Sequence, residues 1–195
     1  MHLVRRSVAH YVAAFIALAL SSAPAFALDI SRIRIENFGR VNDTYYRGGQ
    51  PVGKDYAALA AAGIKTVISL TSEDAQPNEE AQVQAAGMKF VQIPMTTHRV
   101  PTAAQVAEFL AIVDNKNAQP VYVHCVGGRH RTGVMTAIYR MTHDNWSASQ
   151  AFAEMKQYKF GADFLHAEFK DFVMGYPAQL AHAAAAAAMT PKAGG

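Results

Sequence analysis

Short apolar runs alternate with amphipathic segments through the middle of this chain. Runs rich in β-branched and aromatic residues predict strands at residues 44–47, 64–70, 88–93 and 120–124. Apolar positions at helical spacing predict helices between them, at residues 55–62, 79–86 and 103–115. Strands that alternate with helices in this way indicate an α/β fold, with a central, mainly parallel sheet of about four to five strands flanked by helices.

Residues at the ends of these segments agree with the pattern. Gly63 and Gly87 are placed to end the first two helices, and Thr102 is a good N-cap for the third. The strand at 44–47 is expected at the edge of the sheet. Arg47 either reaches a phosphate site or anchors this strand, and the structural role is favoured.

Three more helices are predicted after the last strand, at residues 132–142, 147–159 and 162–174, and Ser147 is the N-cap expected for the second. The alanine-rich end of the chain, residues 178–195, is expected to be a flexible tail. No internal repeat, metal motif or second domain is evident. Large apolar residues at roughly helical spacing are expected in the core rather than around a substrate: Phe152, Met155, Phe160, Phe164, Phe169 and Phe172.

The first 27 residues resemble a secretory signal peptide in composition. Arg5 and Arg6 precede a mostly apolar run at 8–20, and Ala25-Phe26-Ala27 is a small-residue cleavage pattern. We expect cleavage after Ala27 and a periplasmic or secreted protein, with no stable membrane insertion afterwards. An uncleaved N-terminal anchor is the alternative. The predicted organisation is therefore a signal peptide at 1–27, one catalytic domain at 28–177 and the tail.

Composition and charge narrow the possible partners. Hydrophobic residues make up 51% and charged residues 17% of the chain, which fits a globular domain. The net charge is +3, and removal of Arg5 and Arg6 with the signal peptide leaves +1. The sequence therefore gives no argument for a nucleic acid or a membrane as partner. A monomer is expected.

The most informative stretch is VYVHCVGGRHRTGV at residues 121–134. A short strand runs into a glycine-bearing loop, which leads into an apolar helix. Backbone N–H groups of such a loop converge on one point, and the helix dipole adds partial positive charge there. The phosphate-binding residues predicted from this pattern are Val126, Gly127, Gly128, Arg129, His130 and Arg131.

The only cysteine of the chain, Cys125, lies in this anion cradle. The field that holds an anion also stabilises a thiolate, so we expect Cys125 to be a nucleophile. Arg131 can present a planar fork of donors to two phosphate oxygens. Thr132 can donate its hydroxyl to the sulfur and assist its departure, and His124 is expected to order the loop by hydrogen bonding.

These residues carry a resemblance to a known superfamily. HCVGGRHRTG resembles the HC-x-x-G-x-x-R-[ST] signature of the cysteine-dependent tyrosine and dual-specificity phosphatases, with a match at His124, Cys125, Gly128, Arg131 and Thr132. YYRGGQP at 45–51 is similar to a segment of bacterial dual-specificity-like phosphatases. The resemblance implies a tyrosine-phosphatase-like fold, a phosphocysteine intermediate and no metal or organic cofactor.

The proton donor of that superfamily has no obvious counterpart. The family usually places an aspartate on the loop after the strand that precedes the active strand, and here that loop, residues 94–101, contains no carboxylate. His130 is the first substitute, either as general acid or only as a cation. His98 is the second, and Glu73 and Asp74 are weaker candidates.

The sequence leaves the substrate open. Phosphorylated proteins, phosphoinositides and soluble inositol phosphates are the candidates, and GRHRTG is similar to GKHRTG in plant and fungal phosphatases of inositol pyrophosphates. A catalytically weak pseudophosphatase that only binds phosphate is an alternative. A rhodanese-like sulfurtransferase is disfavoured by Arg131-Thr132-Gly133.

Overall fold

The computed structural model describes residues 30–189 of the chain. The predicted signal peptide at 1–27 lies outside these residues, so cleavage and export stay predictions. Of the predicted tail, residues 190–195 also lie outside them.

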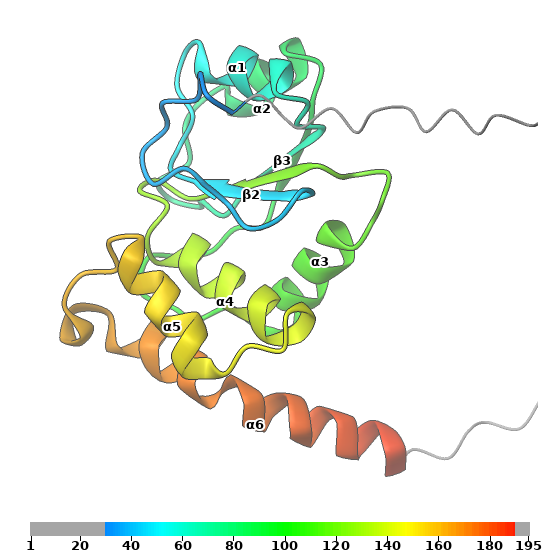
Figure 1. Ribbon diagram of the computed structural model, residues 1–195, viewed down its shortest axis with the longest axis vertical. Helices are drawn as coiled ribbons and strands as arrows, with labels where there is room; N and C mark the ends of the chain where they lie inside the picture. The colour runs from blue at the N-terminus through cyan, green and yellow to red at the C-terminus, as the bar shows by residue number, and fades with distance from the viewer. Residues whose placement is uncertain (1–29, 190–195) are drawn as a thin grey trace, which may run out of the picture.

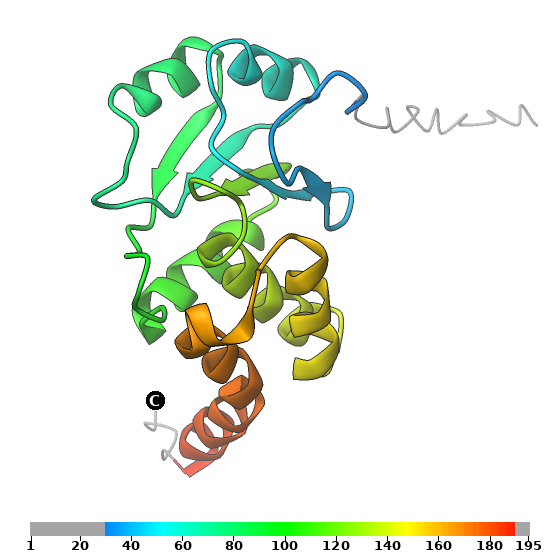
Figure 2. The ribbon, with the colours of Figure 1, turned by 90° about the vertical axis from the view of Figure 1, so that its left-hand side faces the viewer.

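A five-stranded sheet forms the centre of the molecule, with the strand order β1-β2-β5-β3-β4 (Figures 1 and 2). β1 is antiparallel to β2, and all other neighbours are parallel. The predicted α/β fold with a mainly parallel sheet is therefore confirmed. The strands are β1 (Gly39–Arg40), β2 (Tyr45–Gly48), β3 (Thr66–Ser69), β4 (Lys89–Gln92) and β5 (Val121–His124).

The position of β2 differs from the expectation. β2 lies between β1 and β5, so the edge on that side is β1 and not β2. β1 was not predicted from the sequence, because a two-residue strand is too short to show alternation. Gly39 suits this position, since an added Cβ would collide with the ring of Tyr158.

Helices cover both faces of the sheet (Figure 1). α1 and α2 pack on one face, where Tyr122 of β5 joins a core cluster with Leu59 and Val83. The remaining helices pack on the other face, where Val121 and Val123 contribute to the larger core cluster. The helices are α1 (Asp55–Ala61), α2 (Glu79–Ala85), α3 (Ala103–Val113), α4 (Arg131–His143), α5 (Ala148–Gln157), the 3-10 helix η1 (Asp163–His166) and α6 (Ala167–Met189).

Two of the N-caps match the sequence prediction. Thr102 and Ser147 each accept a hydrogen bond from the backbone N–H three residues later, and each forms a capping box with a glutamine. Because these caps fix where α3 and α5 begin, they also fix the direction in which each helix leaves its loop.

The C-terminal region departs from the prediction in two ways. The expected helix at 162–174 is divided into η1 and α6, and α6 continues to Met189, through part of the stretch expected to be a tail. Alanine has the highest helix propensity, which accounts for the extension. The expectation that Phe164 lies in the core is wrong, because this residue lies in η1 and is 80% exposed. Phe169 of α6 is buried, as expected.

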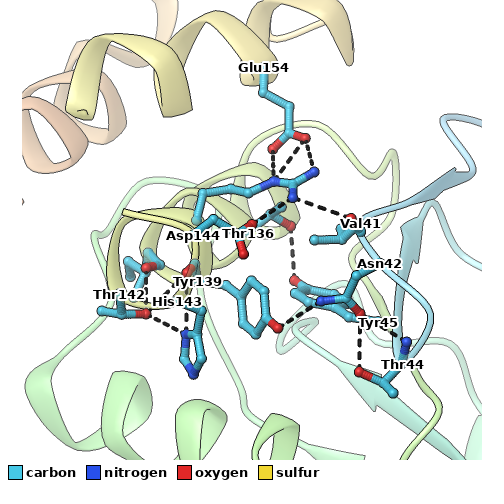
Figure 3. A network of polar contacts seen from close by, with 12 residues as sticks. Val41, Asn42, Thr44, Tyr45, Thr136, Tyr139, Thr142, His143, Asp144 and Glu154 are labelled. Atoms are coloured by element: carbon cyan, nitrogen blue, oxygen red, sulfur yellow. Dashed lines mark hydrogen bonds and ion pairs between the residues drawn. The ribbon is translucent and has the colours of Figure 1, made fainter. Parts of the chain in front are cut away.

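A polar network joins α4 to its neighbours (Figure 3). Arg140 donates to Glu154 of α5 at 2.7 Å, to Asp144, and to the carbonyl oxygen of Val41. The hydroxyls of Tyr45 and Thr136 are 2.9 Å apart and join β2 to the same helix. The network therefore fixes the helix that begins at the cysteine loop.

Within residues 30–189, no helix has both the length and the apolar character needed to cross a membrane.

We expect Arg140→Leu to destabilise the protein by about 3 kcal/mol, because Glu154 would keep a nearly buried carboxylate without its partner. Chemical denaturation of the variant measures this loss. The double variant Arg140→Leu/Glu154→Leu should recover part of it. Equal losses in the single and double variants would show that the ion pair is not the cause.

Candidate active site

The cysteine loop lies at the carboxyl end of the central strand. β5 ends at His124, and it pairs with β2 on one side and β3 on the other. Cys125 follows directly and is 3% exposed. α4 begins at Arg131, so the loop connects a central parallel strand to a helix N-terminus, as the sequence predicted.

Three donors hold the loop carbonyl groups from outside. The carbonyl oxygens of Val126, Gly127 and Gly128 accept from the backbone N–H of Gln50 at 2.9 Å, from Asn37 Nδ2 at 2.7 Å and from Arg47 Nη2 at 2.6 Å, respectively. In a trans peptide the N–H points away from the carbonyl, so the N–H groups of residues 127–129 face the opposite side. Within residues 30–189, no backbone N–H of residues 126–131 donates to a protein acceptor. These donors are available to a bound anion.

Gly128 is required by the close approach of two backbones. Its φ is +64°, and an added Cβ would lie 2.4 Å from the carbonyl carbon of Gly48. Arg47 is fully buried beside this contact and stacks on the ring of Tyr158 at 3.9 Å. Arg47 therefore makes a structural contact, but this contact holds the cysteine loop and does not anchor an edge strand as expected.

The guanidinium of Arg131 is fixed by an aspartate. Nη1 and Nη2 donate to the two carboxylate oxygens of Asp74 at 2.8 and 2.5 Å, and Nη1 also donates to the carbonyl of Met95 at 2.9 Å. This end-on pairing leaves the side-on fork, Nε–H and one N–H of Nη2, without an acceptor in the part of the chain that the structure describes. Burial alone would lower the pKa of Arg131, but Asp74 raises it overall, and Arg131 in turn lowers the pKa of Asp74.

A second buried carboxylate lies behind the cysteine. Oε1 of Glu79 is 3.0 Å from Nε2 of His124, without the alignment of a good hydrogen bond, and it accepts from Gln50 Nε2 at 2.5 Å and from the hydroxyl of Tyr56 at 3.3 Å. Burial would raise the pKa of Glu79, but these contacts outweigh it and lower that pKa. The sequence did not single out Glu79, and neither ring nitrogen of His124 makes a hydrogen bond to a described residue, so the expected ordering of the loop by hydrogen bonds from His124 is not observed. The hydroxyl of Thr132 is buried and makes no hydrogen bond to a described residue.

A cavity of about 410 Å³ opens over the sulfur. Six of the eight predicted site residues line it, and the other two, Gly128 and Thr132, do not. The sequence reasoning missed Glu36 and Thr97 and gave Asp74 only a minor place. The residues that line the cavity are Glu36, Asp74, Thr97, Cys125, Val126, Gly127, Arg129, His130 and Arg131.

The candidates for the proton donor are not equivalent. Asp74 has both oxygens occupied by Arg131 and a lowered pKa, which disfavours it as an acid. Glu73 does not line the cavity, and its pKa is lowered by the hydroxyl of Ser72. His130 lines the cavity, and its Nε2 is 3.0 Å from the carbonyl oxygen of Phe160, which makes Nε2 the donor and leaves Nδ1 free. Burial lowers the pKa of His130. His98 is exposed and lies outside the cavity lining.

This cysteine loop on a central parallel strand, with an arginine fixed over the cavity, is the arrangement expected of the cysteine-dependent phosphatase class. The profile of a family described as "DSP-PTPase phosphatase fused to NAD+ Kinase" matches residues 33–172. The chain belongs to this family of dual-specificity-type phosphatases.

Two relatives illustrate the range of the similarity. The dual specificity protein phosphatase TpbA of Pseudomonas aeruginosa is 31% identical over 125 residues, which cover 64% of this chain and 56% of TpbA. The inositol diphosphatase SIW14 of Saccharomyces cerevisiae is 28% identical over 130 residues, which cover 64% of this chain and 46% of SIW14. The chain thus spans about half of the length of these relatives.

Solved structures of the same two proteins share the fold. A TpbA crystal structure superimposes with a TM-score of 0.62 and 27% identity, over 72% of this chain and 84% of that one. The SIW14 catalytic core in complex with citrate gives 0.62 and 25%, over 72% and 85%. A TpbA variant in complex with phosphotyrosine gives 0.61 and 27%, over 71% and 83%.

We expect Gly128→Ala to destabilise the protein by about 3 kcal/mol, because the side chain would meet the backbone of Gly48 at a positive φ. Gly127→Ala is the matched control, since a Cβ there would meet only the flexible side chain of Arg129. Thermal unfolding of both variants measures the difference. Similar melting temperatures would mean that the loop can move away from Gly48.

Proposed function

We propose that this protein hydrolyses phosphate monoesters through a phosphocysteine intermediate on Cys125, and that phosphotyrosine in proteins is its preferred class of substrate. The observation that carries the proposal is the ring of unpaired donors around the sulfur. The backbone N–H groups of residues 126–131 and the side-on fork of Arg131 have no protein acceptor among the described residues. A tetrahedral dianion beside the sulfur would satisfy both.

The chemistry follows in two steps. The thiolate of Cys125 attacks phosphorus, the bond to the leaving oxygen breaks, and that oxygen takes a proton. Water then attacks the phosphocysteine, which releases inorganic phosphate and restores the thiolate. Arg131 and the loop N–H groups stabilise the equatorial oxygens in both transition states. The unpartnered hydroxyl of Thr132 is placed to donate to the departing sulfur in the second step.

His130 is proposed as the proton donor. It lines the cavity, and only its Nδ1 is free, because Nε2 faces the carbonyl of Phe160. In the neutral ring that Nδ1 is an acceptor, so it can donate only when the imidazole is protonated. A bound phosphate dianion favours this protonated form, which offsets the effect of burial.

The charges at the cavity mouth favour a single phosphate group. Glu36 accepts from Arg129 at 2.7 Å and lies 3.4 Å from Lys159, so it partly neutralises both cations. Asp74 does the same for Arg131. A polyphosphorylated ring would require these cations to be unpaired, whereas a phosphotyrosyl group presents one dianion to the cradle. The similarity to TpbA, of which a phosphotyrosine complex has been solved, agrees with this choice.

An inositol pyrophosphate is the second candidate. It is supported by the similarity to the inositol diphosphatase SIW14 and by the presence of Arg129 and Lys159 near the cavity. The two candidate substrates differ in how many unpaired cations they need. Glu36 pairs with both Arg129 and Lys159, so it is the residue to substitute.

The nucleophile is tested first. Wild type should hydrolyse an aryl phosphate with a burst of phenol, the sign of a covalent intermediate, and Cys125→Ser should lower kcat by about 10³ or more. Equally slow wild type and variant, with phosphate still bound, would identify a pseudophosphatase and refute the proposed reaction.

The substrate class is tested with Glu36→Gln, with Glu108→Gln on the exposed face of α3 as the control. The Glu36 variant should gain roughly two- to fivefold in kcat/KM toward an inositol pyrophosphate at low salt, because Arg129 and Lys159 lose their counter-charge. Turnover of a phosphotyrosine peptide should change less. A wild-type kcat/KM for the inositol pyrophosphate above that for the peptide would refute the preference.

The acid is tested by pH and leaving group. Since burial lowers the pKa of His130 in the free protein, kcat/KM for an alkyl phosphate should fall with rising pH, and the fall should begin below the pH at which an ordinary histidine loses its proton. His130→Ala should remove this fall and slow alkyl phosphates at least about tenfold more than aryl phosphates. His143→Ala, remote from the cavity lining, is the control. Equal slowing of alkyl and aryl substrates would mean that His130 only binds.

A further inference from the structure

Three side chains that are distant in the sequence converge beside the active-site cavity. His98 lies in the loop between β4 and α3, His166 is the last residue of η1, and Glu168 is in the first turn of α6. One ligand atom from each lies within 4.8 Å of the other two. The rings of His98 and His166 are stacked, with centroids 6.2 Å apart and planes at 19°.

Two of these ligand atoms lack a hydrogen-bond partner among the described residues. Nδ1 of His166 and Oε1 of Glu168 are shielded from solvent, and neither has a hydrogen bond to a described residue. They lie 3.6 Å from each other, which is too long for a hydrogen bond. A shielded imidazole nitrogen and carboxylate oxygen that remain unpaired cost free energy, so such groups normally have a partner.

We propose that His98, His166 and Glu168 bind a divalent transition metal ion of the zinc class. Two imidazoles and one carboxylate are the ligand set of many three-ligand zinc sites, with a fourth position left for water. Two nitrogen ligands disfavour Mg²⁺ and Ca²⁺, which prefer oxygen. This site lies outside the chemistry proposed for Cys125, which uses no metal.

Only a small movement would bring the three ligand atoms from within 4.8 Å of one another to the spacing of a zinc site. Zinc–nitrogen and zinc–oxygen bonds of about 2.0–2.2 Å put neighbouring ligand atoms of a tetrahedral site roughly 3.4 Å apart. His98 is the member that can move, since it is exposed and sits in a loop. Its rotation toward the fixed pair would close the site without moving a strand or helix.

The position of the site connects it to the cavity. The His166 ring is 3.7 Å, centroid to centroid, from the ring of His130, and Thr97, which precedes His98, also lines the cavity. A bound ion would hold the β4–α3 loop against η1 at the edge of the cavity.

Metal binding is tested in the full chain without an affinity tag, in a Cys125→Ser background, because a thiolate is itself a metal ligand. Titration with Co²⁺ should give the visible absorption of a tetrahedral complex, saturate at one ion per chain and be reversed by Zn²⁺. Saturating Zn²⁺ should also raise the melting temperature by about 5 °C.

Substitutions locate the ion. His98→Ala and Glu168→Gln should each weaken Co²⁺ binding at least about tenfold, and His98→Ala alters only an exposed side chain, so the fold is kept. His143→Ala is the matched control, since His143 also faces a carboxylate, Asp114, at 2.8 Å but has no third ligand among the described residues. Absence of saturable binding, or an equal loss in His143→Ala, would overturn the proposal. Because Cys125 is absent throughout, the result is independent of phosphatase activity.

Discussion

The arrangement of the active site depends on how the loop after β5 is held. Its carbonyl groups face outward because Asn37, Arg47 and Gln50 donate to them, and its N–H groups therefore face inward. All three donors come from the segment that surrounds β2, more than seventy residues earlier in the chain. The anion cradle is thus a property of the folded sheet and exists before any ligand binds. Such preorganisation is the main way in which fixed dipoles stabilise a transition state.

Two ion pairs fix the arginines that line the cavity. Arg131 is held by Asp74 and Arg129 by Glu36, so each cation has one side occupied and one side free. An arginine with a fixed counter-ion loses less side-chain freedom on binding than a free one. The same pairing limits attraction for a ligand with many phosphates. In the proposed reaction, the same two carboxylates would therefore set both the orientation of the arginines and the preference for a single phosphate group.

The sequence predicted the parts of this structure that depend on neighbours along the chain. The alternation of strands and helices, the caps Thr102 and Ser147, and the cradle at 125–131 are all local patterns, and each is visible in a short window. β1 was missed, and Phe164 was wrongly expected in the core, because a two-residue strand and a single 3-10 turn carry no measurable period.

The rest of the candidate site arises from contacts between distant segments. The sequence did not single out Glu36 and Glu79, and it named Asp74 only as a weak candidate for the acid. Their contacts appear only when the fold places them beside Arg129, His124 and Arg131, respectively. No spacing rule connects His98 to His166. The catalytic use of Cys125 and its neighbours remains a proposal that rests on this geometry and on the family.

The contact between His130 and the carbonyl of Phe160 has a consequence for the C-terminal region. The segment from α5 to α6 covers one side of the histidine and sets which of its nitrogens faces the reacting group. A protein shortened before this segment would lose the acceptor that holds Nε2 of His130, and the imidazole would be free to turn. In the proposed reaction, the C-terminal helices would therefore be needed to keep Nδ1 of His130 directed at the leaving oxygen.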